Sequence, residues 1–249
     1  QASAQGLDYG TKYTPYQVQW SLNVQREIGS GNVATIGYAG ADGIHQRNSN
    51  YNALQASLDR RFTRNVSVQA AYTWSKCIDG TGVDRGRCDF DRTQNFRASS
   101  IVALPFRGNP LIAGWEITGI VGATTGAPFS PVLQTGRRPN LAAGRTYKDV
   151  VTGGLDRYFD PAAFTVPVTG TLGNVGRNVL TGPGYSNVDI AVIKNTAIPS
   201  IAESFNVQFR AEFFNVLNHT NFGQPNATVP APTAGQIRTA SASRQIQLA

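Results

Sequence analysis

Hydrophobic and polar residues alternate along most of this chain, so that every second side chain is apolar. In residues 17–27 the apolar positions are Val18, Trp20, Leu22 and Val24, and the residues between them are polar. A period of two places such side chains on opposite faces of a β-strand. The same pattern, interrupted by turns rich in glycine and asparagine, predicts further strands. The full set spans residues 17–27, 33–38, 52–62, 66–74, 95–104, 115–124, 187–195, 205–217 and 244–249.

These strands predict an all-β fold, an antiparallel up-and-down sheet or barrel of about nine to ten long strands. Short turns fall on one side of it, at residues 28–32, 63–65, 105–114 and 196–204. Long loops fall on the other side, at residues 39–51, 75–94, 125–186 and 215–243. We expect residues 1–249 to form a single β-barrel-type domain. Within it, residues 1–15 are an N-terminal arm or an extra strand, and residues 125–186 are a long loop that carries function or interaction.

Strand length and loop asymmetry are both typical of outer-membrane barrels. A tilted strand of about 9–11 residues crosses the hydrocarbon core of a bilayer, and most of the predicted strands have this length. Barrels also place short turns on the periplasmic side and long loops outside. The chain has no apolar run long enough for a transmembrane helix, so that class of membrane protein is excluded.

The charge of the chain narrows the possible partners. Its formal net charge is +7, yet only 15% of the residues are charged, and the basic residues are scattered rather than clustered. Nucleic-acid binding requires a basic patch or stripe, so no nucleic-acid partner is expected. The phosphates of outer-membrane lipid or lipopolysaccharide remain possible partners.

No catalytic constellation stands out, and we expect neither an enzyme nor a cofactor or metal site. Four carboxylates, Asp79, Asp84, Asp89 and Asp91, lie in one stretch but lack the spacing of a calcium-binding loop. Arginines lie among them, which favours ion pairs over a bound cation. The two histidines, His45 and His219, lie in predicted loops, and neither forms a recognisable catalytic arrangement with a Ser or Cys nucleophile.

Two pairs of residues are candidate structural sites. Cys77 and Cys88 lie in a loop rich in glycine and aspartate, and they form either a local disulfide, which requires an oxidising compartment, or two free thiols. Arg210 and Glu212 lie on the polar face of the most regular strand. In a barrel they would face the lumen, as an ion pair within a ladder across strands.

A series of short motifs runs along nearly the whole chain. The motifs are Thr14–Glu27, Ile36–Gly40, Asn50–Leu58, Ala71–Lys76, Asp89–Arg92, Phe159–Phe164, Gly173–Asn178, Phe209–Asn215 and Asn218–Gly223. In this order they resemble the C-terminal β-barrel region of Oar-like TonB-dependent outer-membrane transporters. The resemblance implies an outer-membrane barrel segment in the bacterial outer membrane. The family's plug domain and many of its strands are absent here, so TonB-coupled uptake does not carry over to this chain by itself.

The strand count leaves open how the sheet is completed. An odd number of up-and-down strands leaves the first and last parallel, whereas a closed antiparallel sheet needs an even number. Three partners can then complete the sheet: further barrel strands, a tenth strand from the N-terminal residues 2–13, or other copies of the chain that pair through open sheet edges. Pairing between copies predicts a self-assembling extracellular or surface filament or tube. An unbroken apolar band on one face of the sheet would favour the membrane barrel.

Overall fold

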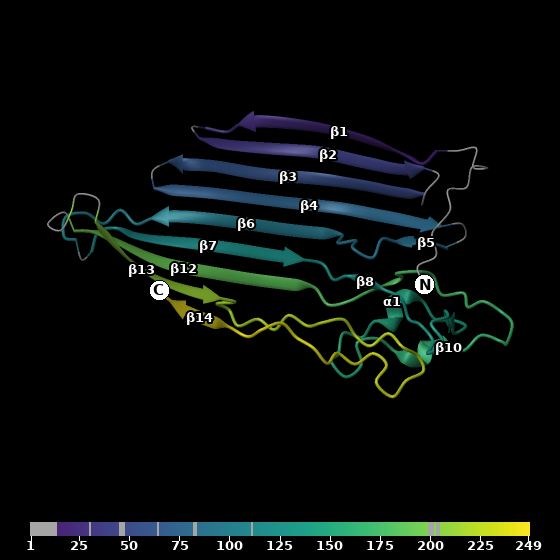
Figure 1. Ribbon diagram of the computed structural model, residues 1–249. Coiled ribbons are helices and arrows are strands. Elements are labelled where there is room, and N and C mark those ends of the chain that lie inside the picture. Colours follow the sequence, from purple (N-terminus) through teal and green to yellow (C-terminus); the bar gives the residue numbers. More distant parts are fainter. Residues whose placement is uncertain are drawn as a thin grey trace, which may run out of the picture.

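The computed structural model describes residues 14–29, 31–44, 48–63, 65–81, 84–110, 112–198, 202 and 205–249. Most of the chain forms one ten-stranded sheet (Figure 1). Its strands are β1 (Tyr16–Glu27), β2 (Asn32–Ile44), β3 (Ser49–Thr63), β4 (Val66–Thr81), β5 (Asp84–Arg87), β6 (Gln94–Ala103), β7 (Trp115–Thr124), β12 (Tyr185–Ala197), β13 (Asn206–Phe214) and β14 (Gln245–Leu248).

The strands follow one another across the sheet in the order β1-β2-β3-β4-β6-β7-β12-β13-β14, and β5 folds back on the end of β4. Every pairing in the sheet is antiparallel. The predicted all-β, up-and-down architecture is therefore confirmed. Within the described residues, β1 and β14 lie at opposite edges of the sheet and are not paired with each other.

The prediction of a long loop at residues 39–51 is wrong, because β2 continues to Ile44 and β3 already begins at Ser49. Gly40, which suggested a turn, is a site of close approach within the sheet. Trp20 on β1 lies across Gly40 and occupies the place that a Cβ would take. In the same way, the side chain of Asn23 lies against Gly37. A strand glycine often marks such packing by a neighbour rather than a break in the strand.

The predicted loop at residues 75–94 is also largely strand. β4 continues to Thr81, and β5 pairs with its end between Ile78 and Thr81. We call residues 75–93 the cysteine hairpin, because Cys77 and Cys88 lie on its two arms. The predicted N-terminal arm lies outside the described residues over positions 1–13. The same holds for His45 and the neighbouring Gln46 and Arg47.

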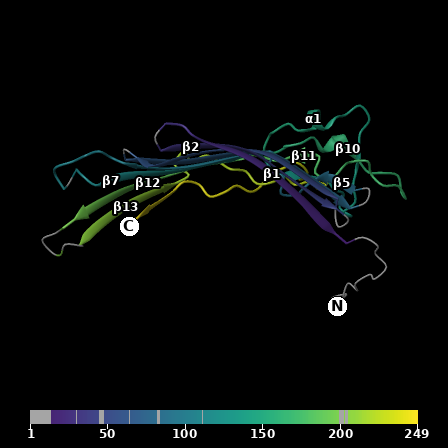
Figure 2. The same ribbon diagram turned by 90° about the horizontal axis from the view of Figure 1, so that it is seen from above.

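Residues 125–184 fold into short elements packed beyond one end of the sheet (Figures 1 and 2). They are β8 (Pro128–Phe129), β9 (Asn140–Leu141), α1 (Tyr147–Val150), the 3-10 turn η1 (Pro161–Ala163), β10 (Phe164–Thr165) and β11 (Leu180–Thr181). Together with residues 219–243 they form what we call the loop subdomain. Val132 bridges to Thr228, and the Val229 N–H donates to the carbonyl of Val132, which joins the two segments.

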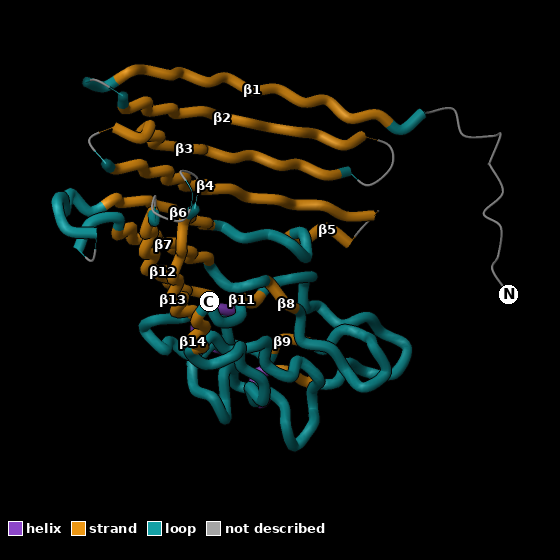
Figure 3. The backbone as a smooth tube through the Cα atoms, turned by 60° about the vertical axis from the view of Figure 1, so that its left-hand side comes forward, coloured by secondary structure: helices purple, strands orange, loops and turns teal. Residues whose placement is uncertain are grey.

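The largest buried hydrophobic cluster of the described residues lies in this loop subdomain. Phe159 is fully buried at its centre, with ring centroids 5.7 Å from Phe129 and 5.9 Å from Phe164. The cluster also contains Val150, Ala163, Val175, Leu180, Val229 and Ala234. The sheet, by contrast, is a single curved layer with little packed on either face (Figure 3). No second layer of the described structure therefore buries the hydrophobic side chains of the sheet.

Candidate functional site

One face of the sheet is apolar except near the ends of its strands. Directly opposed residues in an antiparallel pair share a face, and the register aligns Leu22, Tyr38, Leu54 and Trp74 in one row across four strands. The same face continues to β14. Its central positions, apolar apart from Ser100, are Val18, Trp20, Leu22, Val24, Ala34, Ile36, Tyr38, Gly40, Leu54, Ala56, Leu58, Val66, Val68, Ala70, Tyr72, Trp74, Phe96, Ala98, Ser100, Val102, Ile117, Gly119, Val121, Ala123, Val188, Ile190, Val192, Val207, Phe209, Ala211, Phe213, Ile246 and Leu248.

This apolar face is exposed. The side chains of Leu22, Val24 and Ile36 are 71%, 66% and 61% accessible. A soluble monomer rarely exposes a contiguous apolar patch larger than a few hundred Å², and larger patches mark interaction with protein or membrane. The face is therefore an interaction surface. No helix in the described part of the chain is long and apolar enough to span a bilayer.

The opposite face of the sheet is mostly polar. Its positions include Gln19, Ser21, Asn23, Gln25, Gln55, Ser57, Asp59, Gln69, Thr73, Asn95, Arg97, Ser99, Glu116, Thr118, Asp189, Gln208, Arg210, Glu212, Gln245 and Gln247. The predicted pair Arg210 and Glu212 lies on this face, with 3.4 Å between Nη1 of Arg210 and Oε1 of Glu212. Both belong to β13, so the pair runs along one strand rather than across the sheet.

The apolar rows end in polar side chains at both ends of the strands. At the end where residues 125–184 and 215–244 connect the strands, which we call the long-loop end, these are Asp42, Asn50, Asn52 and Lys76. The opposite end, which we call the short-turn end, carries Arg26, Asn32, Arg60 and Lys194. Between them, the apolar stretch of β4 from Val66 to Trp74 measures about 26 Å along the strand at about 3.3 Å per residue.

At the long-loop end the cysteine hairpin is closed by a disulfide between Cys77 and Cys88, with 5.4 Å between their Cα atoms. Both cysteines are buried. Asp91, which is only 3% exposed, accepts a hydrogen bond on Oδ1 from the Cys77 N–H at 3.0 Å. The carboxylate therefore takes the place of a strand partner at the point where β4 and β6 separate.

Arg87 and Asn178 join the cysteine hairpin to the loop subdomain. The Arg87 guanidinium donates to the carbonyls of Asn178 and Leu180 at 2.9 and 2.8 Å, and to the Thr181 hydroxyl at 2.8 Å. In return, Nδ2 of Asn178 donates to the Arg87 carbonyl and to Oδ1 of Asp89, both at 2.7 Å. Burial lowers the pKa of Arg87, and the charge of Asp91 opposes that shift. These reciprocal bonds fix the position of the Gly173–Asn178 segment against the hairpin.

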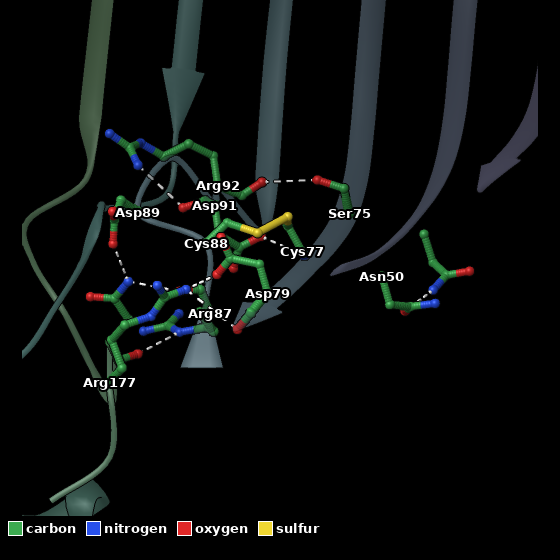
Figure 4. The surroundings of a disulfide bond; sticks show 12 residues. Asn50, Ser75, Cys77, Asp79, Arg87, Cys88, Asp89, Asp91, Arg92 and Arg177 are labelled. Carbon is green, nitrogen blue, oxygen red and sulfur yellow. Dashed lines mark hydrogen bonds and ion pairs between the residues drawn. A yellow bond between two sulfur atoms is a disulfide. The ribbon is translucent and has the colours of Figure 1, made fainter. Parts of the chain in front are cut away.

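Two ion pairs strengthen the same junction. Asp79 pairs with Arg177, and Asp84 pairs with Arg138 (Figure 4 shows the first pair beside the disulfide). The carboxylates considered as calcium ligands are thus engaged with arginines, an asparagine and a backbone N–H. Among the described residues, no group of three or more His, Cys, Asp or Glu side chains could hold a metal ion.

An asparagine turn fixes the chain where β13 ends, a feature the strand pattern did not predict. Asn215 adopts a φ of 51° and is buried. Its Nδ2 donates to the carbonyl of His219, its Oδ1 accepts from the His219 N–H, and its own N–H donates to Asp189. Asn221 forms two further bonds with the backbone of Ser186. His219 therefore serves here through its backbone.

Charged side chains also brace α1 and η1 in the loop subdomain. The Thr146 hydroxyl and N–H donate to Asp149, and these bonds, together with Arg145, lower the pKa of Asp149. For Asp160, burial acts to raise the pKa, but hydrogen bonds from Arg145 and the Ala162 N–H, with the charge of Arg157, outweigh it, so that pKa is also lowered. The same two carboxylates raise the pKa of Arg145.

The two-faced sheet, with long loops at one end, is the arrangement of a barrel wall, and the comparison with known families agrees. The family model described as "Outer membrane beta barrel domain" matches residues 44–247. The chain belongs to this outer-membrane β-barrel family. Membership assigns it to the bacterial outer membrane. Neither the curated proteins nor the solved structures gave a match.

Seen as a segment of an outer-membrane barrel, the sheet has features that suit a bilayer. Tilted by about 40°, the apolar stretch of β4 covers about 20 Å of membrane thickness, close to the usual band of about 25 Å. Trp20, Tyr38 and Trp74 lie toward the long-loop end of the apolar face, and Trp115 toward the short-turn end. Aromatic residues gather in this way at both interfaces of barrels.

Lys194 shows how a charge is accommodated at the short-turn end of the apolar face. Its ammonium donates to the carbonyl of Pro110 at 2.7 Å and to the Thr196 hydroxyl at 3.0 Å, and lies 5.9 Å from the ring centre of Trp115. Long cationic side chains near the end of a membrane-spanning element reach toward the interface in this manner. The charge therefore does not interrupt the apolar band.

Proposed function

We propose that this chain forms part of the transmembrane wall of a transporter-type outer-membrane barrel, with the apolar face toward lipid and the polar face toward the lumen. The observation that carries the proposal is the continuity of the exposed apolar face from β1 to β14, opposite a mostly polar face. A barrel in lipid needs this arrangement on every strand.

The transport part of the proposal is supported by the resemblance of nine motifs to Oar-like TonB-dependent transporters. Three of these motifs now have a structural role. Gly173–Asn178 binds the cysteine hairpin, Phe209–Asn215 ends β13 in the asparagine turn, and Asn218–Gly223 joins that turn to Ser186. Features shared with transporters thus maintain the long-loop end of the barrel, where a substrate from outside would arrive.

Cysteine scanning along β3 tests the proposal. The natural cysteines are bonded to each other, so an introduced thiol is the one that reacts with a maleimide. In membranes containing the full chain, we expect a membrane-impermeant maleimide to label cysteines at Gln55, Ser57 and Asp59. Cysteines at Leu54, Ala56 and Leu58, on the apolar face, should stay unlabelled until the membrane is dissolved. Equal labelling of both sets in intact membranes would refute the proposal.

A second candidate function is self-assembly into filaments or tubes. One observation favours it: β1 pairs with β2 along one edge, and no described strand pairs with its other edge between Gln17 and Glu27. An open edge readily accepts another strand. Filaments in electron micrographs of the detergent-free chain, combined with equal labelling of both β3 faces, would favour this candidate over the barrel wall.

A further inference from the structure

A hollow of about 490 Å³ lies at the long-loop end of β2, β3 and β4. Its lining is Tyr38, Asn52, Ala53, Leu54, Trp74, Ser75, Lys76, Arg87, Asp91 and Thr93. The hollow lies beside the notch where β4 leaves β6: the last paired residues are Trp74 and Gln94, and the Cys77 N–H then turns to Asp91. One side of the hollow is therefore the long-loop end of the apolar face, and the other side is formed by buried polar groups.

Lys76 supplies a positive charge at this edge. It is exposed, lies one row beyond Trp74 on the apolar face, and has no ion-pair partner among the described residues. Asn52 stands opposite it in the register and accepts a hydrogen bond from the Tyr38 hydroxyl. A cation beside neutral polar groups, with apolar rows below, is suited to an anion that carries a hydrophobic part.

Asp91 supplies the second, independent feature. Asp91 is only 3% exposed and lines the hollow, yet of its two carboxylate oxygens only Oδ1 accepts a hydrogen bond within the described residues. Oδ2 is buried without a hydrogen-bond partner there. A buried acceptor left without a donor costs free energy, so a ligand with a hydroxyl group would gain a strong, charge-assisted bond at this oxygen.

We infer that this hollow binds the phosphorylated sugar headgroup of a glycolipid in the outer leaflet. A sugar hydroxyl donates to Oδ2 of Asp91, and the phosphate pairs with Lys76. Acyl chains continue over Leu54 and Trp74. Because the Asp91 carboxylate repels a phosphate, the phosphate lies on the Lys76 side of the hollow.

The shape of the site argues for an amphipathic occupant. A free phosphate ion would engage Lys76 but would leave Oδ2 of Asp91 without a donor and the rows below the hollow uncovered. A neutral lipid would cover those rows but leave the Lys76 charge unpaired. The inference rests on the proposed function, since only in a barrel wall with its long loops outside does Lys76 face the outer leaflet.

Titration with lipid A tests the inference. The full chain, extracted from membranes in detergent, is titrated with diphosphorylated lipid A, with dephosphorylated lipid A and with inorganic phosphate, and binding is followed by the shift in the thermal unfolding midpoint. We expect saturable stabilisation by diphosphorylated lipid A alone. Loss of one charge-assisted contact should weaken its binding to Lys76→Gln about tenfold. Lys76→Arg, which keeps the charge, should retain most of the affinity.

Lys148→Gln is the matched control, because Lys148 is an exposed lysine on α1 in the loop subdomain. It should bind like the unaltered chain. Equal affinity of Lys76→Gln and Lys148→Gln would overturn the inference, as would equal stabilisation by dephosphorylated lipid A or by phosphate alone. The β3 labelling pattern, measured in the membranes before extraction, separates the two hypotheses. If the two faces of β3 are labelled equally, both the barrel wall and the glycolipid site are refuted. If the labelling pattern is as expected but lipid A shows no selectivity, only the glycolipid site is refuted.

Discussion

At the scale of single residues, asparagines fix the turns of this chain. Asn65, Asn178, Asn215 and Asn218 have φ values between 50° and 67°. This left-handed conformation is unfavourable for most residues, but asparagine tolerates it because its short side chain bonds to nearby backbone. Asn178 and Asn215 are also buried and use their amides as described above. A glycine at these positions could also adopt the left-handed conformation, but it could not form the side-chain hydrogen bonds that Asn178 and Asn215 form.

Substituting Asn178 should separate these two contributions. We expect Asn178→Ala to lower the free energy of unfolding by about 2–4 kcal/mol, because it loses three side-chain hydrogen bonds and strains the backbone. Asn178→Gly keeps the conformation and should lose only about half as much. Urea unfolding in detergent micelles measures both. Asn206→Ala, at an exposed position, is the control and should change stability little; a similar loss in all three variants would contradict the role assigned to Asn178.

The lowered pKa values of Asp149 and Asp160 predict a pH dependence of the loop subdomain. A carboxyl whose pKa is lower in the folded state stabilises the fold above its unfolded pKa, about 3.9. That stabilisation is lost as the pH falls through the folded pKa. Proteolysis between residues 125 and 184 by an acid-active protease should therefore accelerate as the pH falls below about 4. Asp160→Asn should reduce this acceleration; an unchanged pH profile in that variant would show that Asp160 does not contribute.

At the scale of elements, the period of two predicted strands well and their ends less well. Alternation identified each long strand of the sheet, because one face is apolar along its central rows and the other is mostly polar. It failed at residues 39–44, since Gly40 reads as a turn until the neighbouring Trp20 is seen lying across it. Packing by a side chain on another strand is not visible in the local pattern.

The loop subdomain shows the same limit on a larger scale. Phe159, Val175 and Val229 are far apart in the sequence and follow no period, yet they meet in one buried cluster. Such a core depends on long-range contacts, so composition suggested only a long loop. The sequence left open whether Cys77 and Cys88 form a disulfide or two free thiols. The bonds between Arg87 and Asn178, which join the cysteine hairpin to the loop subdomain, became evident only from the structure.

Paired lysine substitutions on β2 test the assignment of the two faces. Ile36 lies in the middle of the apolar face and Thr35 on the polar face. We expect Ile36→Lys to destabilise the inserted chain by about 2–4 kcal/mol, as for a lysine at the midplane of a barrel. Thr35→Lys should cost much less because it faces the lumen. The fraction folded in lipid vesicles across a urea series measures both, and equal losses would contradict the assignment.

At the scale of the whole molecule, two differently built parts meet at the cysteine hairpin. The sheet is a single layer whose apolar side chains remain exposed, whereas the loop subdomain has a core of its own. Hydrogen bonds and ion pairs from Arg87, Arg138 and Arg177 connect them. The hairpin thus determines where the loop subdomain lies relative to the barrel wall.

Removing the disulfide should therefore loosen the junction without unfolding the sheet. We expect the double variant Cys77→Ser, Cys88→Ser to lose about 2–4 kcal/mol of stability and to be cleaved faster within residues 125–184. The lysine and cysteine substitutions on β2 and β3 should behave as before in this background. Unchanged protease resistance would show that the junction does not depend on the disulfide.

Contact between the apolar face and lipid can be measured directly by tryptophan fluorescence. All three tryptophans, Trp20, Trp74 and Trp115, lie on that face. In vesicles made with brominated lipids, we predict strong quenching of all three and little quenching by aqueous iodide. A tryptophan introduced at Thr73, with the other three replaced by phenylalanine, should behave in the opposite way. Native tryptophans quenched by iodide but not by brominated lipid would show that the apolar face does not contact lipid.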